Sequence, residues 1–199
     1  MLSEESRWSS ERGFGFIETL ISISVLTAVS IGVAQLFAVA ALANHNAEAS
    51  TSTSVLAVEK MEQLRSLTWG FETLAGGELG LPISDVTTDL SVFPSTSGGP
   101  GLLASPGGTL DSNVPYYVDY LNADGTWIGT GGSPPSGTVY IRRWAVDRLP
   151  NSPNDTVVLQ VLATTLKQER LRATAGASGP RGKLPADSWL LTVKTRKGV

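Results

Sequence analysis

Glu18 raises the clearest chemical question in this sequence. It is the only charged residue between Phe14 and Ala43, in a run that is otherwise apolar or uncharged. An unpaired carboxylate in lipid costs on the order of a few kcal/mol even on the mildest scales. Glu18 therefore needs either a cationic partner or a position at the level of the lipid headgroups, where it would cap its own helix.

Other reactive groups are few. The chain has no cysteine, one histidine (His45) and a formal net charge of -3. These numbers exclude disulfides, thiolate nucleophiles and the common zinc sites, and they give no basic patch for nucleic acid. His45 is expected to be a solvated helix residue. We find no nucleophile paired with a base, so we expect neither an enzyme nor a cofactor or metal site.

Two further clusters have simple explanations. Asp119, Asn122 and Asp124 resemble part of a calcium loop, but Tyr120 replaces the acid that the ligand alternation needs, so a hairpin turn is favoured. Arg142 and Arg143 precede Trp144 in a predicted strand. Only one of the two arginines can share a face with Trp144 for a cation–π contact, because adjacent strand residues face opposite sides.

The apolar run is long enough for a membrane. From Phe14 to Ala43 a helix would span roughly 45 Å, whereas the hydrocarbon core needs only about 20 residues. A secretory signal peptide is the rival interpretation, but its apolar part is only about 7–15 residues long. Arg7 and Arg12 before the run favour a cytoplasmic amino terminus and a carboxy-terminal part across the membrane.

The helix is predicted to continue beyond the membrane, to about residue 68. Ala57, Met61, Leu64 and Thr68 form an apolar stripe, widened by Val58 and Leu67. The remaining residues, Lys60 among them, lie mostly off this stripe. Gly70 is a plausible stop. The stripe would pack on a folded domain.

The rest of the chain is predicted to be an antiparallel sheet after a loop. Residues 70–113 are rich in Gly, Pro, Ser and Thr, which is typical of a loop with at most short elements. A second loose region covers 173–187. The expected fold is α+β, with the sheet packed on the distal half of the helix. The predicted strands are Tyr116–Leu121, 126–130 with a turn at Asp124-Gly125, Thr138–Leu149, Thr156–Leu166 and Ser188–Arg196.

The residues "RGFGFIE" at the start of the helix carry a family resemblance. A glycine, a phenylalanine and a glutamate four residues later, before a long apolar helix, resemble the class III leader of type IV prepilins and type II secretion pseudopilins. The segment "LAVEKMEQLRSLTW" is similar to the helix end of V-type minor pilins and I-type pseudopilins, and "YIRRWAV" resembles a strand of that subgroup.

The resemblance implies that a prepilin peptidase cleaves between Gly13 and Phe14 and that the new amine of Phe14 is methylated. It also implies that Glu18 pairs with the amine of a neighbouring subunit and sets the register of helices in a filament. The resemblance covers roughly the first 35 residues. Two features depart from the family pattern: the leader is net acidic where such leaders are usually basic, and Gly15 stands where larger or polar residues are usual. The helix lacks the proline, and the chain lacks the cysteine pair, that major pilins often carry, and these absences favour a minor pilin or pseudopilin.

The expected organisation has four parts: a cleaved leader (1–13), a transmembrane and assembly half of the helix (14–43), an amphipathic half (44–69), and a periplasmic loop and sheet domain (70–199). The expected location is the bacterial inner membrane, followed by a pilus or pseudopilus of a type IV pilus, type II secretion or competence system. The expected partners are other subunits, the peptidase and methylase, and the inner-membrane assembly platform. The alternative is a membrane-anchored periplasmic module that binds a ligand or protein and enters no filament.

Overall fold

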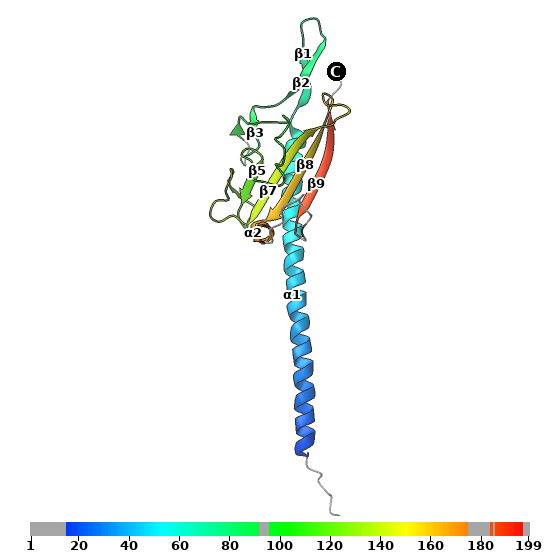
Figure 1. Cartoon of the computed structure of the whole chain (residues 1–199), viewed down its shortest axis with the longest axis vertical. Helices are drawn as coiled ribbons and strands as arrows, with labels where there is room; N and C mark the ends of the chain where they lie inside the picture. The colour runs from blue at the N-terminus through cyan, green and yellow to red at the C-terminus, as the bar shows by residue number, and fades with distance from the viewer. Residues whose placement is uncertain (1–14, 92–95, 175–183, 185, 197–199) are drawn as a thin grey trace, which may run out of the picture. The chain divides into compact units, whose positions relative to one another are not determined.

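The computed structural model describes residues 15–91, 96–174, 184 and 186–196. It has the expected α+β fold, with a long helix, α1 (Phe16–Ser66), and an antiparallel sheet (Figure 1). The chain divides into two units, Met1–His45 and Asn46–Val199. Helix α1 runs through both, and each unit is described by itself below.

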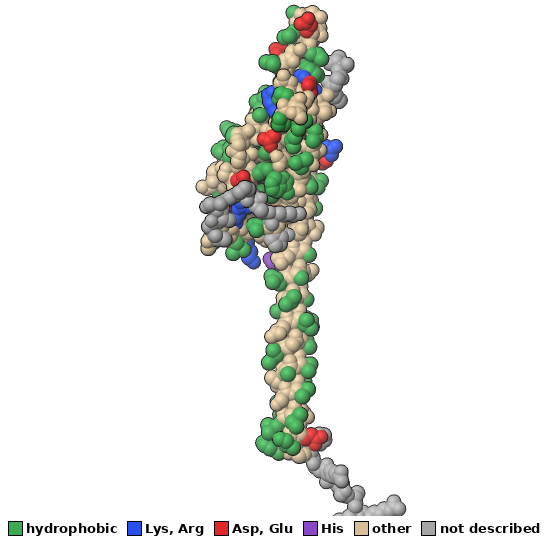
Figure 2. All heavy atoms as spheres, turned by 45° about the vertical axis from the view of Figure 1, so that its right-hand side comes forward, with side chains coloured by type: hydrophobic (Ala, Val, Ile, Leu, Met, Phe, Trp, Pro, Cys, Tyr) green, Lys and Arg blue, Asp and Glu red, His purple; other side chains and the backbone are tan. Residues whose placement is uncertain are grey.

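In the first unit, α1 is exposed and apolar on all sides. Figure 2 shows hydrophobic side chains along the visible face of this segment. The hydroxyls of Ser24 and Thr27 donate to the carbonyls of Leu20 and Ile23, each at 2.8 Å, so these two hydroxyls are satisfied within the helix. By its length and composition, α1 is long and apolar enough to cross a membrane.

The second unit contains a five-stranded sheet of order β6-β5-β7-β8-β9 in which all neighbouring strands are antiparallel. These strands match the five predicted ones. Their bounds are β5 Val118–Leu121, β6 Trp127–Gly129, β7 Tyr140–Arg148, β8 Thr156–Thr165 and β9 Ser188–Thr195.

The turn between β5 and β6 is the predicted one. The Asn122 side chain accepts hydrogen bonds from the backbone amides of Asp124 (3.0 Å) and Thr126 (2.9 Å). Gly125 adopts a φ of 76°, which a glycine accepts without strain. Asp119 is turned into the protein, so it shares no site with Asp124.

The distal half of α1 covers one face of the sheet and forms the main core with it. Buried helix residues such as Ala57 and Leu64 lie in the same apolar cluster as Trp144 and Val161. The predicted stripe was partly wrong. Val58 and Thr68 are exposed, and Lys60 is completely buried at the centre of the covered face. The buried positions of α1 are Thr53, Leu56, Ala57, Lys60, Met61 and Leu64.

The region predicted to be a loop holds four short strands: β1 (Trp69–Thr73), β2 (Leu79–Ser84), β3 (Thr88–Asp89) and β4 (Thr96–Ser97). Gly70 was predicted to stop the helix, but α1 ends at Ser66 and Gly70 lies in β1. The glycines that suggested a loop instead form the turn of a hairpin. Gly76 and Gly77, between β1 and β2, adopt φ values of 103° and 83°.

A second helix, α2 (Leu166–Thr174), was not predicted. It follows β8 directly. The Thr165 hydroxyl accepts a hydrogen bond from the Gln168 amide at 3.2 Å, which is the start of a capping box. The sequence signal for this helix is a threonine followed three residues later by a glutamine.

Candidate functional site: the amino-terminal helix and its attachment to the sheet

Of the three residues predicted to carry the function, only Glu18 is described by the structure. Gly13 and Phe14 lie outside the described residues. Glu18 lies in the first turn of α1, where its backbone amide donates to the Gly15 carbonyl at 2.9 Å. A carboxylate is favourable at this end of a helix because the first amide groups are not paired within the helix.

The Glu18 side chain is exposed, and none of the ion pairs among the described residues includes it. It is the only carboxylate on α1 from Phe16 to Ala47. Any cation that neutralises Glu18 in lipid must therefore come from the segment before Gly15 or from another molecule.

The distal half of α1 is attached to the sheet by a cluster of buried charges. The Lys60 ammonium lies 2.7 Å from Oδ2 of Asp119, on β5. The same oxygen accepts two hydrogen bonds from Arg142, on β7, at 3.0 Å from Nε and 2.8 Å from Nη2. All three side chains are fully buried, so one carboxylate oxygen connects the helix to two strands.

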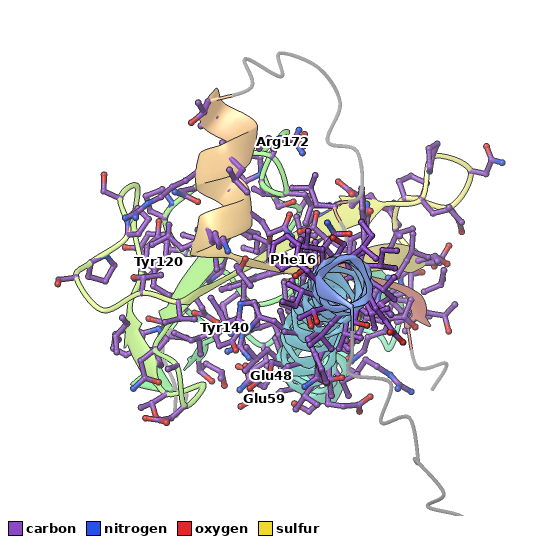
Figure 3. All side chains as sticks on the ribbon, turned by 90° about the horizontal axis from the view of Figure 1, so that it is seen from below. Phe16, Glu48, Glu59, Tyr120, Tyr140 and Arg172 are labelled. Atoms are coloured by element: carbon purple, nitrogen blue, oxygen red, sulfur yellow. The ribbon has the colours of Figure 1, made fainter. Side chains whose placement is uncertain are left out.

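Arg142 also contacts the helix directly. Its Nη1 donates to the Leu56 carbonyl and to the Glu59 carboxylate, each at 3.1 Å. Glu59 is part-exposed at the edge of the cluster and is labelled in Figure 3. The four side chains carry two positive and two negative charges, so the cluster is neutral and three of its members are removed from water together.

Lys60 makes two further contacts. It donates a hydrogen bond to the Leu90 carbonyl, and its ammonium lies 4.3 Å from the ring centroid of Trp144. The cation over Trp144 is thus a lysine from α1. Arg142 shares this face of β7 with Trp144 but binds Asp119, and Arg143 lies on the opposite face.

Burial sets the protonation behaviour of this lysine. Desolvation lowers the pKa of Lys60 to about 8, because loss of water disfavours the charged form. The nearby Asp119 carboxylate raises the pKa and opposes this effect, and Arg142 lowers it further. Because Lys60 is sealed from solvent, its lowered pKa does not make it an available nucleophile.

Arg143 connects the other face of β7 to α2. Its guanidinium binds the Asn113 side-chain oxygen at 2.9 and 2.6 Å and the Glu169 carboxylate at 3.1 Å. On this face burial raises the pKa of Tyr120 to about 12, and the positive charge of Arg143 acts in the opposite direction. The described residues contain no group of three or more His, Asp or Glu that could hold a metal ion.

Sequence reasoning missed the buried cluster because a lysine in an amphipathic helix is normally assigned to the solvent face. A usable signal existed. Lys60 falls on the same helical face as Leu56 and Leu64, four residues to either side, and β5 and β7 carry an aspartate and an arginine in their apolar centres. Comparisons with protein-family models, with curated proteins and with solved structures found no match to this chain.

Proposed function

We propose that this chain is a minor pilin or pseudopilin, a structural subunit that is processed at its amino terminus and built into a filament anchored in the inner membrane. The single observation that supports this most is Glu18: one carboxylate in the first turn of an apolar helix long enough to cross a membrane. Phe14 stands four residues before Glu18 and directly after Gly13, which is the spacing of the prepilin cleavage motif.

The charge balance gives the proposal its physical logic. Before cleavage, Glu18 has no cationic partner on its own helix and is costly in lipid. Cleavage after Gly13 creates an amine on Phe14, which keeps its positive charge when methylated once. That amine then pairs with the Glu18 carboxylate of a neighbouring subunit, as the resemblance to the family implies. Processing thereby supplies the ion pair on which assembly depends.

The second unit supports the same proposal. The charge cluster around Asp119 fixes the distal half of α1 to the sheet within this unit. A loosely tethered binding module has no need of such an attachment. The peptidase, the methylase, other subunits and the assembly platform are the partners that this proposal requires.

The experiment is a comparison of Gly13→Ala with Gly15→Ala in cells that express a prepilin peptidase. Gly13→Ala should leave the full-length precursor, because the peptidase requires glycine before the scissile bond. Gly15→Ala should be cleaved, because a methyl group at Gly15 meets only the Ile17 side chain at 3.9 Å. Two results contradict the proposal: cleavage of both variants, or a full-length precursor for both variants and for the unaltered chain.

A further inference from the structure

The hairpin β1–β2 carries an uncovered apolar face. Leu79, Leu81 and Ile83 alternate along β2 and are 51%, 68% and 50% exposed. Ile83 is paired with Gly70, which has no side chain to cover it. Among the described residues, β1 and β2 pair only with each other. A free two-stranded hairpin is marginally stable in water, and an exposed apolar row on one marks an interaction surface.

The hairpin's own charged residues are both acidic, whereas the guanidinium of Arg196 lies over the ring of Phe71. Phe71 pairs with Pro82, on the face away from Leu81 and Ile83. Glu72 and Glu78 are exposed on the hairpin, and no lysine, arginine or histidine occurs anywhere between Arg65 and Arg142. Figure 2 shows hydrophobic and acidic side chains toward the tip of this arm and basic side chains nearer the sheet. A surface complementary to the Leu79–Leu81–Ile83 face of the hairpin is therefore apolar at its centre and positively charged around that centre.

Helix α2 has such a surface. Lys167, Arg170 and Leu171 are exposed and share one face of the helix, at spacings of three and four residues. Leu171 is 60% exposed and lies one turn after Lys167, next to Arg170. The one acid of α2, Glu169, is turned toward Arg143 at 3.1 Å. Figure 3 shows α2 projecting from the unit, with Arg172 on it.

The two surfaces lie at opposite ends of the second unit (Figure 1). The hairpin begins just after Leu67, whose carbonyl binds Lys194, and Lys194 is paired with Val157 near the start of β8. Helix α2 begins where β8 ends. Two surfaces so placed cannot meet within one copy, but each can meet the other surface on a second copy.

We propose that the β1–β2 hairpin of one copy docks on the Lys167–Arg170–Leu171 face of α2 in a second copy. The lengths agree: Leu79 to Ile83 covers roughly 13 Å of strand, and the nine residues of α2 cover roughly 13.5 Å. The contact is head-to-tail, so it repeats along a row of subunits and does not close into a symmetric dimer. It rests on the proposed function, because a filament holds copies in such a row.

The contact alone is small beside a standard interface of about 1,600 Å². It therefore forms when membrane helices hold the copies at high local concentration. The test uses full-length chains in membranes. The test introduces Leu81→Cys on one tagged chain and Leu171→Cys on a differently tagged chain. Because the sequence has no cysteine, no native thiol competes in the cross-linking. Oxidation should give a mixed dimer, and a chain with both substitutions should give a ladder.

The matched control replaces Leu81→Cys with Val193→Cys, which is 54% exposed on β9 and should give little mixed dimer with Leu171→Cys. Lys167→Glu with Arg170→Glu should lower the Leu81–Leu171 coupling about tenfold. Glu72→Lys with Glu78→Lys on the partner should restore it. This recovery requires direct contact, so misfolding of one variant cannot imitate it.

Equal coupling of Val193→Cys and Leu81→Cys, or absence of the mixed dimer, overturns the docking. The docking is also overturned if the Glu72→Lys and Glu78→Lys substitutions fail to restore the coupling and the Lys167/Arg170 variant stops binding vesicles of 30% anionic lipid. In that case α2 binds a membrane surface. The readout is independent of processing. A correctly cleaved chain without coupling contradicts the docking alone, and an uncleaved chain contradicts the proposed function.

Discussion

The ammonium group of Lys60 lies 2.7 Å from Oδ2 of Asp119, and both side chains are completely buried. This pair joins the long helix to the sheet. Asp119 also binds Arg142 through the same oxygen, while its Oδ1 atom has no hydrogen-bond partner among the described residues. One carboxylate oxygen therefore binds both Lys60 and Arg142 in this attachment.

Asp119→Asn should destabilise the protein by about 3–5 kcal/mol, because it leaves Lys60 and Arg142 buried without their anion. Urea unfolding of the full chain in detergent, followed by tryptophan fluorescence, measures this. Asp124→Asn in the exposed β5–β6 turn is the matched control and should change stability by less than about 0.5 kcal/mol. Equal midpoints for the two variants would show that the cluster does not hold the helix to the sheet.

The lowered pKa of Lys60 predicts an unusual pH dependence. Between about pH 8 and the ordinary lysine value of 10.5, the unfolded chain binds more protons than the folded one. Stability should therefore rise with pH from about 8 upward, by about 2 kcal/mol up to pH 9.5. Above pH 10 the raised pKa of Tyr120 acts in the opposite direction, because only the unfolded chain then loses the tyrosine proton.

Lys60→Met is the control for this pH profile. It removes the titrating group but keeps the Arg142–Asp119 pair, so its stability should be flat between pH 8 and 9.5. A similar rise in the variant would assign the pH dependence to another group.

Lys194 ties the last strand to the end of α1 through hydrogen bonds to the carbonyls of Arg65 and Leu67. A cation at a helix carboxy terminus satisfies free carbonyls and interacts favourably with the helix dipole. Lys194→Met should lower the free energy of unfolding by about 1 kcal/mol. Thermal unfolding checks this, with Lys167→Met on the exposed face of α2 as the neutral comparison. No difference between the two would remove Lys194 as a cap.

Gly101 is required by a close backbone approach. Its φ is 56°, and an added Cβ would lie 2.1 Å from the Asp85 carbonyl oxygen. Gly101→Ala should force the backbone after β4 away from Asp85, which follows β2, and destabilise the protein by about 2 kcal/mol or more. Gly132→Ala, where an added Cβ meets nothing within 4 Å, is the matched control. Unchanged proteolytic sensitivity in both variants would contradict this account.

The sequence predicted the apolar helix and the five sheet strands because hydrophobic periodicity follows directly from burial on one face. It did not predict the β1–β2 hairpin, since glycine and proline there indicated a loop. Lys60 was missed for a different reason. A helical pattern classifies each residue by type, whereas the burial of a lysine depends on a partner such as Asp119, which lies far away in the sequence. Gly13 and Phe14 carry a prediction about processing that lies outside the described residues.

Glu18→Gln should leave cleavage after Gly13 intact but reduce incorporation into filaments. The amide keeps the size of the side chain and removes the charge that pairs with the Phe14 amine. The fraction of subunit recovered in sheared filaments, relative to the membrane fraction, measures this. Ser22→Ala, one turn further along α1, is the control and should assemble normally. Normal assembly of the Glu18 variant would favour the membrane-anchored binding module.

The most direct test is the intact mass and amino-terminal sequence of the protein recovered from membranes of cells that contain a prepilin peptidase. The account predicts a chain that begins at Phe14 and carries one additional methyl group. A chain that still begins at Met1, or one cleaved after the apolar segment as a signal peptide, would contradict it.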